Sequence, residues 1–177
     1  IIMGKTVTCE LAYIHPSKTK NPHDYSRTPG GSSSGSAAVV ASHMAHLSIG
    51  SQTGGSIIRP AGYCGNFALK PSQGGLHRGE RQTTSMSTHG PHAGSIEDMW
   101  LVAIEIAKRT GGDPNFTGLQ GPSKLPTSIK PGRLIFLETE GWDIVDNKTK
   151  EAFLRLLSQF ENNGVTIVKP VSYTHLT

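Results

Sequence analysis

The hydrophobic residues of the chain fall into short segments whose spacing predicts both helices and strands. Small and apolar residues fill positions 36–47 and predict a buried helix whose amino end faces a serine-rich stretch. Apolar runs at 47–50 and 66–69 predict two short buried strands. The first half of the chain is therefore expected to place a helix and two strands around glycine-rich loops.

The second half begins with a clear helix signal. The segment from Ser95 to Asp98 has the capping-box pattern, apolar residues then recur at helical spacing as far as Ala107, and Gly111 follows as a stop. We therefore predict a capped amphipathic helix between Ser95 and Gly111.

A strand, a helix and a second strand are predicted after a long surface connection at 111–131. They lie at 133–137, 148–161 and 165–168. Strand, helix and strand in this order favour a parallel crossover, so the chain is assigned to the α/β class.

Both ends of the chain read as incomplete. The sequence opens at Ile1 in a strand-like pattern, and three prolines between residues 1 and 31 predict irregular coil there. Residues 172–177 resemble a translated sequencing adapter more than a protein terminus. We expect a partial domain at 1–171, truncated at both ends, and a non-native tail at 172–177.

Composition and charge narrow the class of protein. Hydrophobic residues make up 35% of the chain, and the net charge of +4 is spread along it, so no nucleic acid is expected to bind directly. Cys9 and Cys64 lack the spacing of a zinc module or a disulfide scaffold. No apolar stretch reaches the ~20 residues of a membrane span. These features predict a soluble, cytoplasmic protein.

Two glycine- and serine-rich clusters carry the candidate chemistry. The first runs from Thr28 to Ala38 and contains Gly-Gly-Ser-Ser-Ser-Gly, and the second runs from Gly50 to Ala61 and contains Gln-Thr-Gly-Gly-Ser. Ser32 and Ser56 stand 24 positions apart in the chain. In these residues the sequence resembles the amidase-signature family, whose fold is a mixed sheet sandwiched by helices.

The resemblance implies a role for each matching residue. Ser56 would be the nucleophile and Ser32, after an unusual cis peptide bond, would relay protons to a lysine base. That lysine precedes the first serine by many tens of residues in the family, so Lys5, Lys18 and Lys20 are not assigned the role. The backbone N–H groups of Thr53, Gly54, Gly55 and Ser56 are expected to form the oxyanion hole, and Ser33 is expected to bind the substrate. Arg59 is expected either to brace the loop through backbone carbonyls or a carboxylate, or to bind an anionic group of the substrate.

This assignment is consistent with the chemistry of serine hydrolases. A serine hydroxyl is a poor nucleophile at neutral pH unless a base removes its proton, and a second hydroxyl can bridge to that base. Glycines at 54 and 55 leave room for consecutive backbone N–H groups to turn toward one oxyanion.

The same residues allow other interpretations. A flexible linker is disfavoured because an apolar helix follows the first cluster at once. Gly31 to Gly35 also matches a G-x-S-x-G elbow with Ser33 as nucleophile, but a turn, not a strand, precedes it. Two histidine pairs, at 43 and 46 on one helical face and at 89 and 92, lack a third ligand and are interpreted as surface or loop residues. Cys64 is expected to be a packed, inert thiol.

The predicted activity is hydrolysis of a carboxamide through an acyl-serine, without a metal or an organic cofactor. A small-molecule amide is the expected substrate, and homo-oligomer formation stays open. The alternative within the family is the A-type subunit of a tRNA-dependent amidotransferase, which would add tRNA and a partner subunit. The segment from Ser56 to Pro60 lacks the Ser-Ile-Arg order that is typical of that subunit, which favours a stand-alone amidase. A non-catalytic remnant that binds a ligand is the third alternative.

Overall fold

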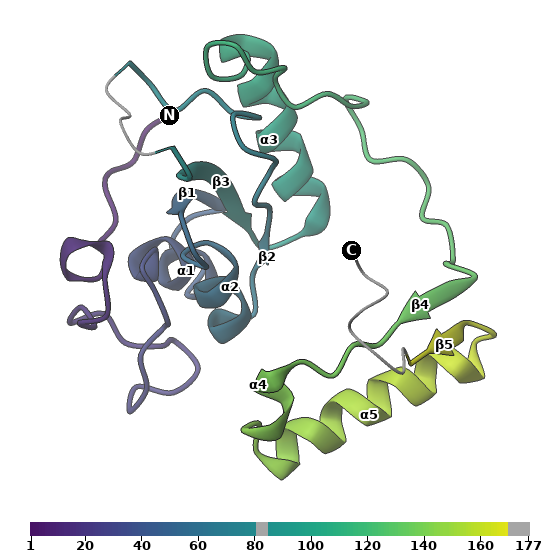
Figure 1. Cartoon of the computed structure of the whole chain (residues 1–177). Helices are drawn as coiled ribbons and strands as arrows, with labels where there is room; N and C mark the ends of the chain where they lie inside the picture. Colours follow the sequence, from purple (N-terminus) through teal and green to yellow (C-terminus); the bar gives the residue numbers. More distant parts are fainter. Residues whose placement is uncertain (81–84, 170–177) are drawn as a thin grey trace. The chain divides into compact units, whose positions relative to one another are not determined.

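A computed structural model describes residues 1–80 and 85–169 and divides the chain into two compact units (Figure 1). The first unit comprises Ile1–Pro126 and the second Thr127–Thr177. The predicted tail at 172–177 lies outside the described residues, and the partial domain at 1–171 stays a prediction.

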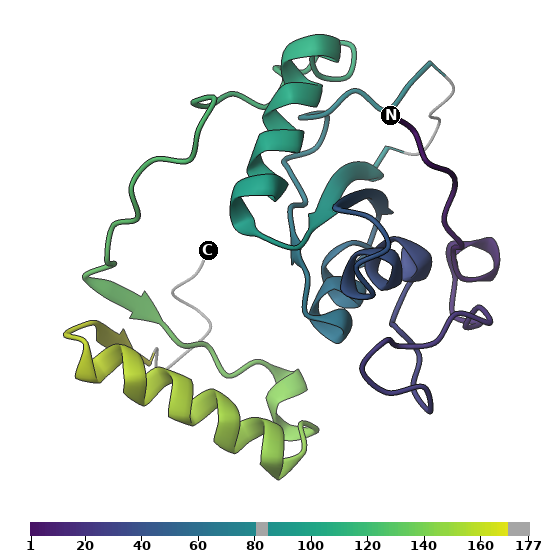
Figure 2. The same cartoon turned by 180° about the vertical axis from the view of Figure 1, so that it is seen from behind.

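The first unit is built on a small antiparallel sheet with the strand order β1-β3-β2. Figures 1 and 2 show α3 on one side of this sheet and α1 and α2 on the other. The strands are β1 (Leu47–Gln52), β2 (Phe67–Ala68) and β3 (Thr88–Ala93), and the helices are η1 (Glu10–Ala12), α1 (Ser34–Ala41), α2 (Ile58–Cys64) and α3 (Ile96–Thr110).

Helix α3 confirms the capped helix that the sequence predicts. The hydroxyl of Ser95 accepts a hydrogen bond from the Asp98 N–H at 3.1 Å, which satisfies one of the unpaired N–H groups at the helix start. Its buried residues include Ala103 and Ile104, and the helix stops before Gly111 at φ 70°. The apolar stripe therefore packs against the sheet while acidic residues occupy the first turn.

The predicted helix at 36–47 begins earlier and ends earlier than expected. Helix α1 stops at Ala41, where the hydroxyl of Ser42 donates to the Ala38 carbonyl at 2.8 Å and His43 turns to φ 58°. The prediction that His43 and His46 share one helical face was therefore wrong, because both follow the helix end.

Strand β3 was not predicted, although it is the central strand of the sheet. It contains Gly90 and Pro91, and proline cannot donate to a ladder and is uncommon in central strands. Pro91 is paired with Ile49 of β1, and its carbonyl accepts a hydrogen bond from Leu69 at 3.1 Å. Contacts on both sides thus override the local turn signal.

The N-terminal segment is irregular, as expected, apart from the single turn η1. It is held against the first glycine-serine cluster by backbone hydrogen bonds. The Cys9 N–H donates to the Ser32 carbonyl at 3.0 Å, and the Gly35 N–H donates to the Val7 carbonyl at 2.8 Å.

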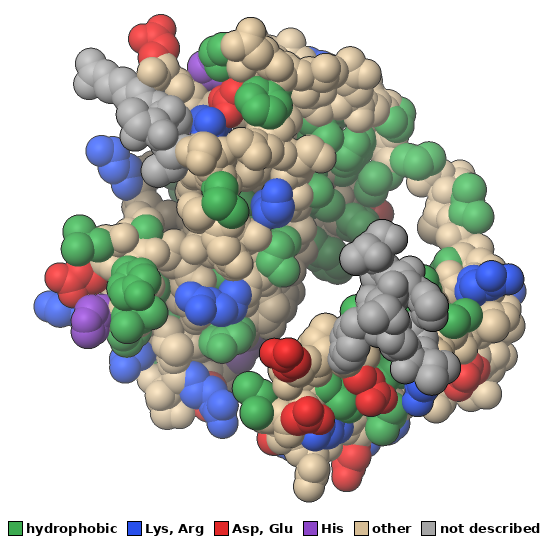
Figure 3. Space-filling view, in the orientation of Figure 1, with side chains coloured by type: hydrophobic (Ala, Val, Ile, Leu, Met, Phe, Trp, Pro, Cys, Tyr) green, Lys and Arg blue, Asp and Glu red, His purple; other side chains and the backbone are tan. Residues whose placement is uncertain are grey.

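The second unit contains the predicted strand, helix and strand. It comprises β4 (Arg133–Ile135), α4 (Glu140–Asp143), α5 (Asn147–Asn162) and β5 (Thr166–Val168), and β4 pairs with β5 in parallel. The rings of Phe136, Trp142 and Phe153 pack together with centroids 5.2 to 5.9 Å apart. Acidic and basic side chains are intermixed on the face of α4 and α5 seen in Figure 3. The parallel crossover is confirmed.

The α/β class is confirmed, with the antiparallel and parallel pairings in separate small sheets. Across residues 1–80 and 85–169, every helix is too short or too polar to traverse a lipid bilayer.

Candidate active site

A cavity of about 1110 Å³ lies in the first unit, where the two glycine-serine clusters meet. The N-terminal segment, strand β1 and His89 of strand β3 complete its wall. The residues assigned to the site from the sequence all line it: Ser32, Ser33, Thr53, Gly54, Gly55, Ser56 and Arg59. No lysine is among the described lining residues.

The two clusters are tied together by hydrogen bonds beside the cavity. The Ser33 N–H donates to the Ser56 carbonyl at 3.2 Å, and Nε of Arg59 donates to the Gly31 carbonyl at 2.9 Å. The peptide bond between Gly31 and Ser32 is cis, as the family resemblance implied. The segments that carry the two candidate serines are thus adjacent in space.

The backbone carbonyl of Ser32 accepts hydrogen bonds, whereas its hydroxyl makes none among the described residues. Its carbonyl accepts hydrogen bonds from Cys9 at 3.0 Å and from Ser34 at 2.8 Å, and the residue is only 4% exposed. In the described part of the chain, no group hydrogen-bonds to the hydroxyl of Ser32 or of Ser56. Both hydroxyls are therefore available to substrate or to a base.

The turn before Ser56 borders open space and carries backbone N–H groups without acceptors in the part of the chain that the structure describes. Within the described ranges, no acceptor binds the backbone N–H groups of Thr53, Gly54, Gly55 and Ser56. A Cβ added at Gly54 or Gly55 would meet no atom within 4 Å. The turn thus borders open space and keeps unpaired donors, which a developing oxyanion requires.

The hydroxyl of Ser33 is engaged with strand β1. It donates to the Ser51 carbonyl at 3.2 Å and accepts from the Ser51 N–H at 3.1 Å, and Ser33 is only 4% exposed. Ser33 therefore fixes the strand to the first cluster.

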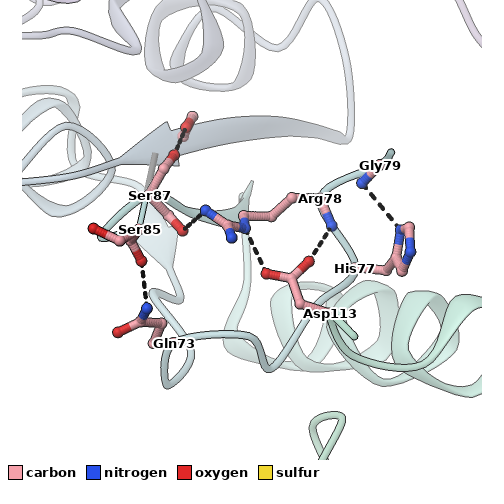
Figure 4. Close-up of polar contacts among 8 residues, drawn as sticks. Gln73, His77, Arg78, Gly79, Ser85, Ser87 and Asp113 are labelled. Carbon is pink, nitrogen blue, oxygen red and sulfur yellow. Dashed lines mark hydrogen bonds and ion pairs between the residues drawn. The ribbon is translucent and has the colours of Figure 1, made fainter. Parts of the chain in front are cut away.

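A buried ion pair between Arg78 and Asp113 is connected to this network through Ser87 (Figure 4). Nε of Arg78 binds Asp113 Oδ2 at 2.5 Å, and Nη1 donates to the Ser87 carbonyl at 2.8 Å. The hydroxyls of Ser87 and Ser51 lie 3.1 Å apart. Burial alone would raise the pKa of Asp113, but hydrogen bonds from Arg78 and its positive charge outweigh burial and lower that pKa.

His92 is fully buried, and His89 lies in the same strand, β3, and lines the cavity, so the interpretation of this pair as surface or loop residues was wrong. A Cβ added at Gly50 would meet both His92 Nε2 and Ser33 Oγ at 2.9 Å. Neither ring nitrogen of His92 has a hydrogen-bond partner among the described residues. Burial lowers the pKa of His92 to about 4.

The other candidates from the sequence were a metal site and a reactive thiol. In the ranges that the structure describes, no three His, Cys, Asp or Glu side chains gather as a metal site would require. Cys64 is buried at the end of α2, and burial raises the pKa of its thiol, which disfavours the reactive thiolate.

Several residues that support the site were not singled out from the sequence. This group comprises Ser51, Gln52, Arg78, Ser87 and Asp113. Gln52 stands inside the second cluster, so its position was a usable signal. Arg78 and Asp113 are 35 residues apart, and only the fold brings them together.

The sequence of this chain is similar to those of known proteins. The whole chain, residues 1–177, matches the sequence model of the family described as Amidase. The A-type subunit of the glutamyl-tRNA(Gln) amidotransferase from Sulfurihydrogenibium sp. (strain YO3AOP1) is 36% identical over 94% of this chain and 36% of the relative.

Solved structures show the same likeness. The crystal structure of the A-type glutamyl-tRNA(Gln) amidotransferase subunit from Thermotoga maritima matches with a TM-score of 0.74 and 26% identity, over 96% of this chain and 40% of that one. The native peptide amidase from Stenotrophomonas maltophilia matches with a TM-score of 0.64 and 25% identity, over 87% and 33% of the two chains. The chain thus spans well under half of these proteins. The chain belongs to the Amidase family.

Proposed function

We propose that this chain is the serine-bearing part of an amide hydrolase that acts through an acyl-serine intermediate. The observation that carries the proposal is the convergence of Ser32 and Ser56 on one cavity, with the cis peptide before Ser32 and unpaired N–H groups before Ser56.

In the proposed reaction, Ser56 Oγ attacks the carboxamide carbon and its proton passes to Ser32, whose own proton moves to a base. That base is a lysine from a part of the protein outside this chain. The N–H groups of residues 53–56 bind the oxyanion of the tetrahedral intermediate, and each such donor is typically worth about 2.7–4 kcal/mol. The C–N bond then breaks, the amine leaves with the returned proton, and water hydrolyses the acyl-serine.

Substrate recognition is proposed to involve Arg59 and Ser33. Arg59 lines the cavity and uses Nε on Gly31, and its Nη groups are proposed to bind an anionic group of a small amide. Ser33 is proposed to shape the pocket by holding Ser51. The proposed steps need no cofactor. We propose that the protein is cytoplasmic and does not bind nucleic acid directly. Homo-oligomer formation is compatible with this proposal.

The test is substitution of the two serines in the complete protein. Ser56→Ala should abolish turnover and the acyl adduct in intact mass spectra, and Ser32→Ala should be nearly as damaging because members of a triad act as a unit. An adduct that persists on another residue in Ser56→Ala, or a loss below about tenfold in kcat for Ser32→Ala, would refute the assigned roles.

The second candidate is an A-type subunit of a tRNA-dependent amidotransferase. It is favoured by the names of the curated relatives and by the Thermotoga maritima structure. The arrangement Ser56-Ile57-Ile58-Arg59 favours the stand-alone enzyme. Steady hydrolysis of simple amides by the purified complete protein would support the stand-alone enzyme. Activity that requires charged tRNA together with partner subunits would support the amidotransferase.

A further inference from the structure

Gln52 closes the turn that carries the candidate nucleophile. It is the last residue of β1, and its side-chain Oε1 accepts hydrogen bonds from the Ile57 N–H at 2.8 Å and the Ile58 N–H at 3.0 Å. Ser56 directly precedes these two N–H groups. One side chain therefore joins the end of the strand to the start of α2 across the whole oxyanion segment.

The turn has little other support. Gly54 and Gly55 have open space where a side chain would lie, and Thr53 and Gly54 are exposed. The Ser56 carbonyl accepts a hydrogen bond from Ser33, and the Gly55 carbonyl accepts one from the Arg59 N–H at 2.8 Å. Both of these bonds use carbonyl groups of the turn, whereas Gln52 binds N–H groups next to the nucleophile.

The placement matters for catalysis because the oxyanion donors work by geometry. Hydrogen-bond donors stabilise the intermediate only when they are held at the position of the oxyanion before reaction. A displacement of about 1 Å can lower the rate about 10²-fold. Loss of the Gln52 acceptor would also leave two N–H groups at the start of a helix without this partner.

We propose that Gln52 is a positioning residue that sets the orientation of Ser56 and the oxyanion donors through its two hydrogen bonds to Ile57 and Ile58. The catalytic consequence of this proposal rests on the proposed function. The hydrogen bonds themselves can be tested without any activity.

The experiment compares three variants of the complete protein. Gln52→Met keeps the length of the side chain but removes the acceptor, whereas Gln52→Glu keeps an oxygen at the same place. Gln120→Met is the matched control, because Gln120 is exposed and does not line the cavity. The readouts are kcat and KM for a simple amide, the thermal midpoint, and amide hydrogen exchange at Ile57 and Ile58.

Gln52→Met should lower kcat about 10²-fold with little change in KM and should speed exchange at both amides. Gln52→Glu should recover most of the rate and the protection, and Gln120→Met should resemble the wild type. The proposal is overturned if exchange is unchanged in Gln52→Met, if Gln52→Glu is as impaired as Gln52→Met, or if kcat falls less than about tenfold. Activity that survives Ser56→Ala would instead overturn the proposed function, while the exchange data would still decide whether Gln52 holds the turn.

Discussion

Nε of Arg59 donates to the carbonyl oxygen of Gly31 at 2.9 Å, which links the helix after the candidate nucleophile to the cis peptide before Ser32. The bond joins residues 28 positions apart in the chain. Arg59 therefore stabilises the geometry of the proposed proton relay, whether or not its guanidinium also binds the substrate.

Arg59→Ala in the complete protein should lower kcat/KM for every amide, with a larger loss for anionic ones. The bracing contact is lost for all substrates, and the proposed contact of Nη with an anion is lost only for some. The measurement is kcat/KM for an anionic amide and for its neutral isostere. A loss at least about tenfold larger on the anion corresponds to about 1.4 kcal/mol of differential binding. Equal losses would reduce Arg59 to a bracing residue.

Local signals were enough to predict some elements and not others. Helix α3 was predictable because its cap at Ser95, its apolar spacing and its stop at Gly111 all lie within one segment. Strand β3 was missed because Gly90 and Pro91 are turn residues by local rules. Only pairing with the remote strands β1 and β2 makes this segment a strand.

The same contrast between local and remote signals applies to the residues of the candidate site. Ser32, Ser56 and the glycines before Ser56 were identified from two short motifs. Supporting residues such as Ser51, Arg78 and Asp113 were not identified, because their partners are remote: Ser51 is bound by Ser33, and Asp113 by Arg78. A hydrogen bond between residues 18 or 35 positions apart produces no periodic pattern in a single sequence.

Gly55→Ala should leave the fold intact and impair catalysis. A methyl group at this position would meet no atom within 4 Å, and the backbone is outside the left-handed region that requires glycine. The free energy of unfolding should therefore change by less than about 1 kcal/mol. In the complete protein, kcat should fall because the turn borders the proposed oxyanion site. Unfolding curves and amide turnover check both parts, and a destabilised variant would contradict the first.

Loss of one partner of the buried pair between Arg78 and Asp113 should be strongly destabilising. Both side chains are at most 9% exposed, and removal of one leaves a buried charge, which typically costs about 3–5 kcal/mol. Asp113→Asn in the complete protein should show this loss by chemical denaturation. Glu105→Gln is the control, because its ion pair with Arg109 is exposed and should change stability by less than about 1 kcal/mol. Similar effects of the two substitutions would contradict the prediction.

His92 should make the folded state sensitive to acid between about pH 6.5 and pH 4. Burial lowers its pKa from 6.5 to about 4, so in this interval the unfolded chain binds a proton that the folded chain does not. Stability rises with pH wherever the unfolded state binds more protons. The contribution is thus fully present above pH 6.5 and lost as the pH falls, by about 3 kcal/mol at most. His92→Leu should flatten this part of the stability curve of the complete protein, and His46→Leu, at an exposed position, is the control. If wild type and His92→Leu lose stability in parallel between pH 7 and pH 4.5, the buried histidine is not the group responsible.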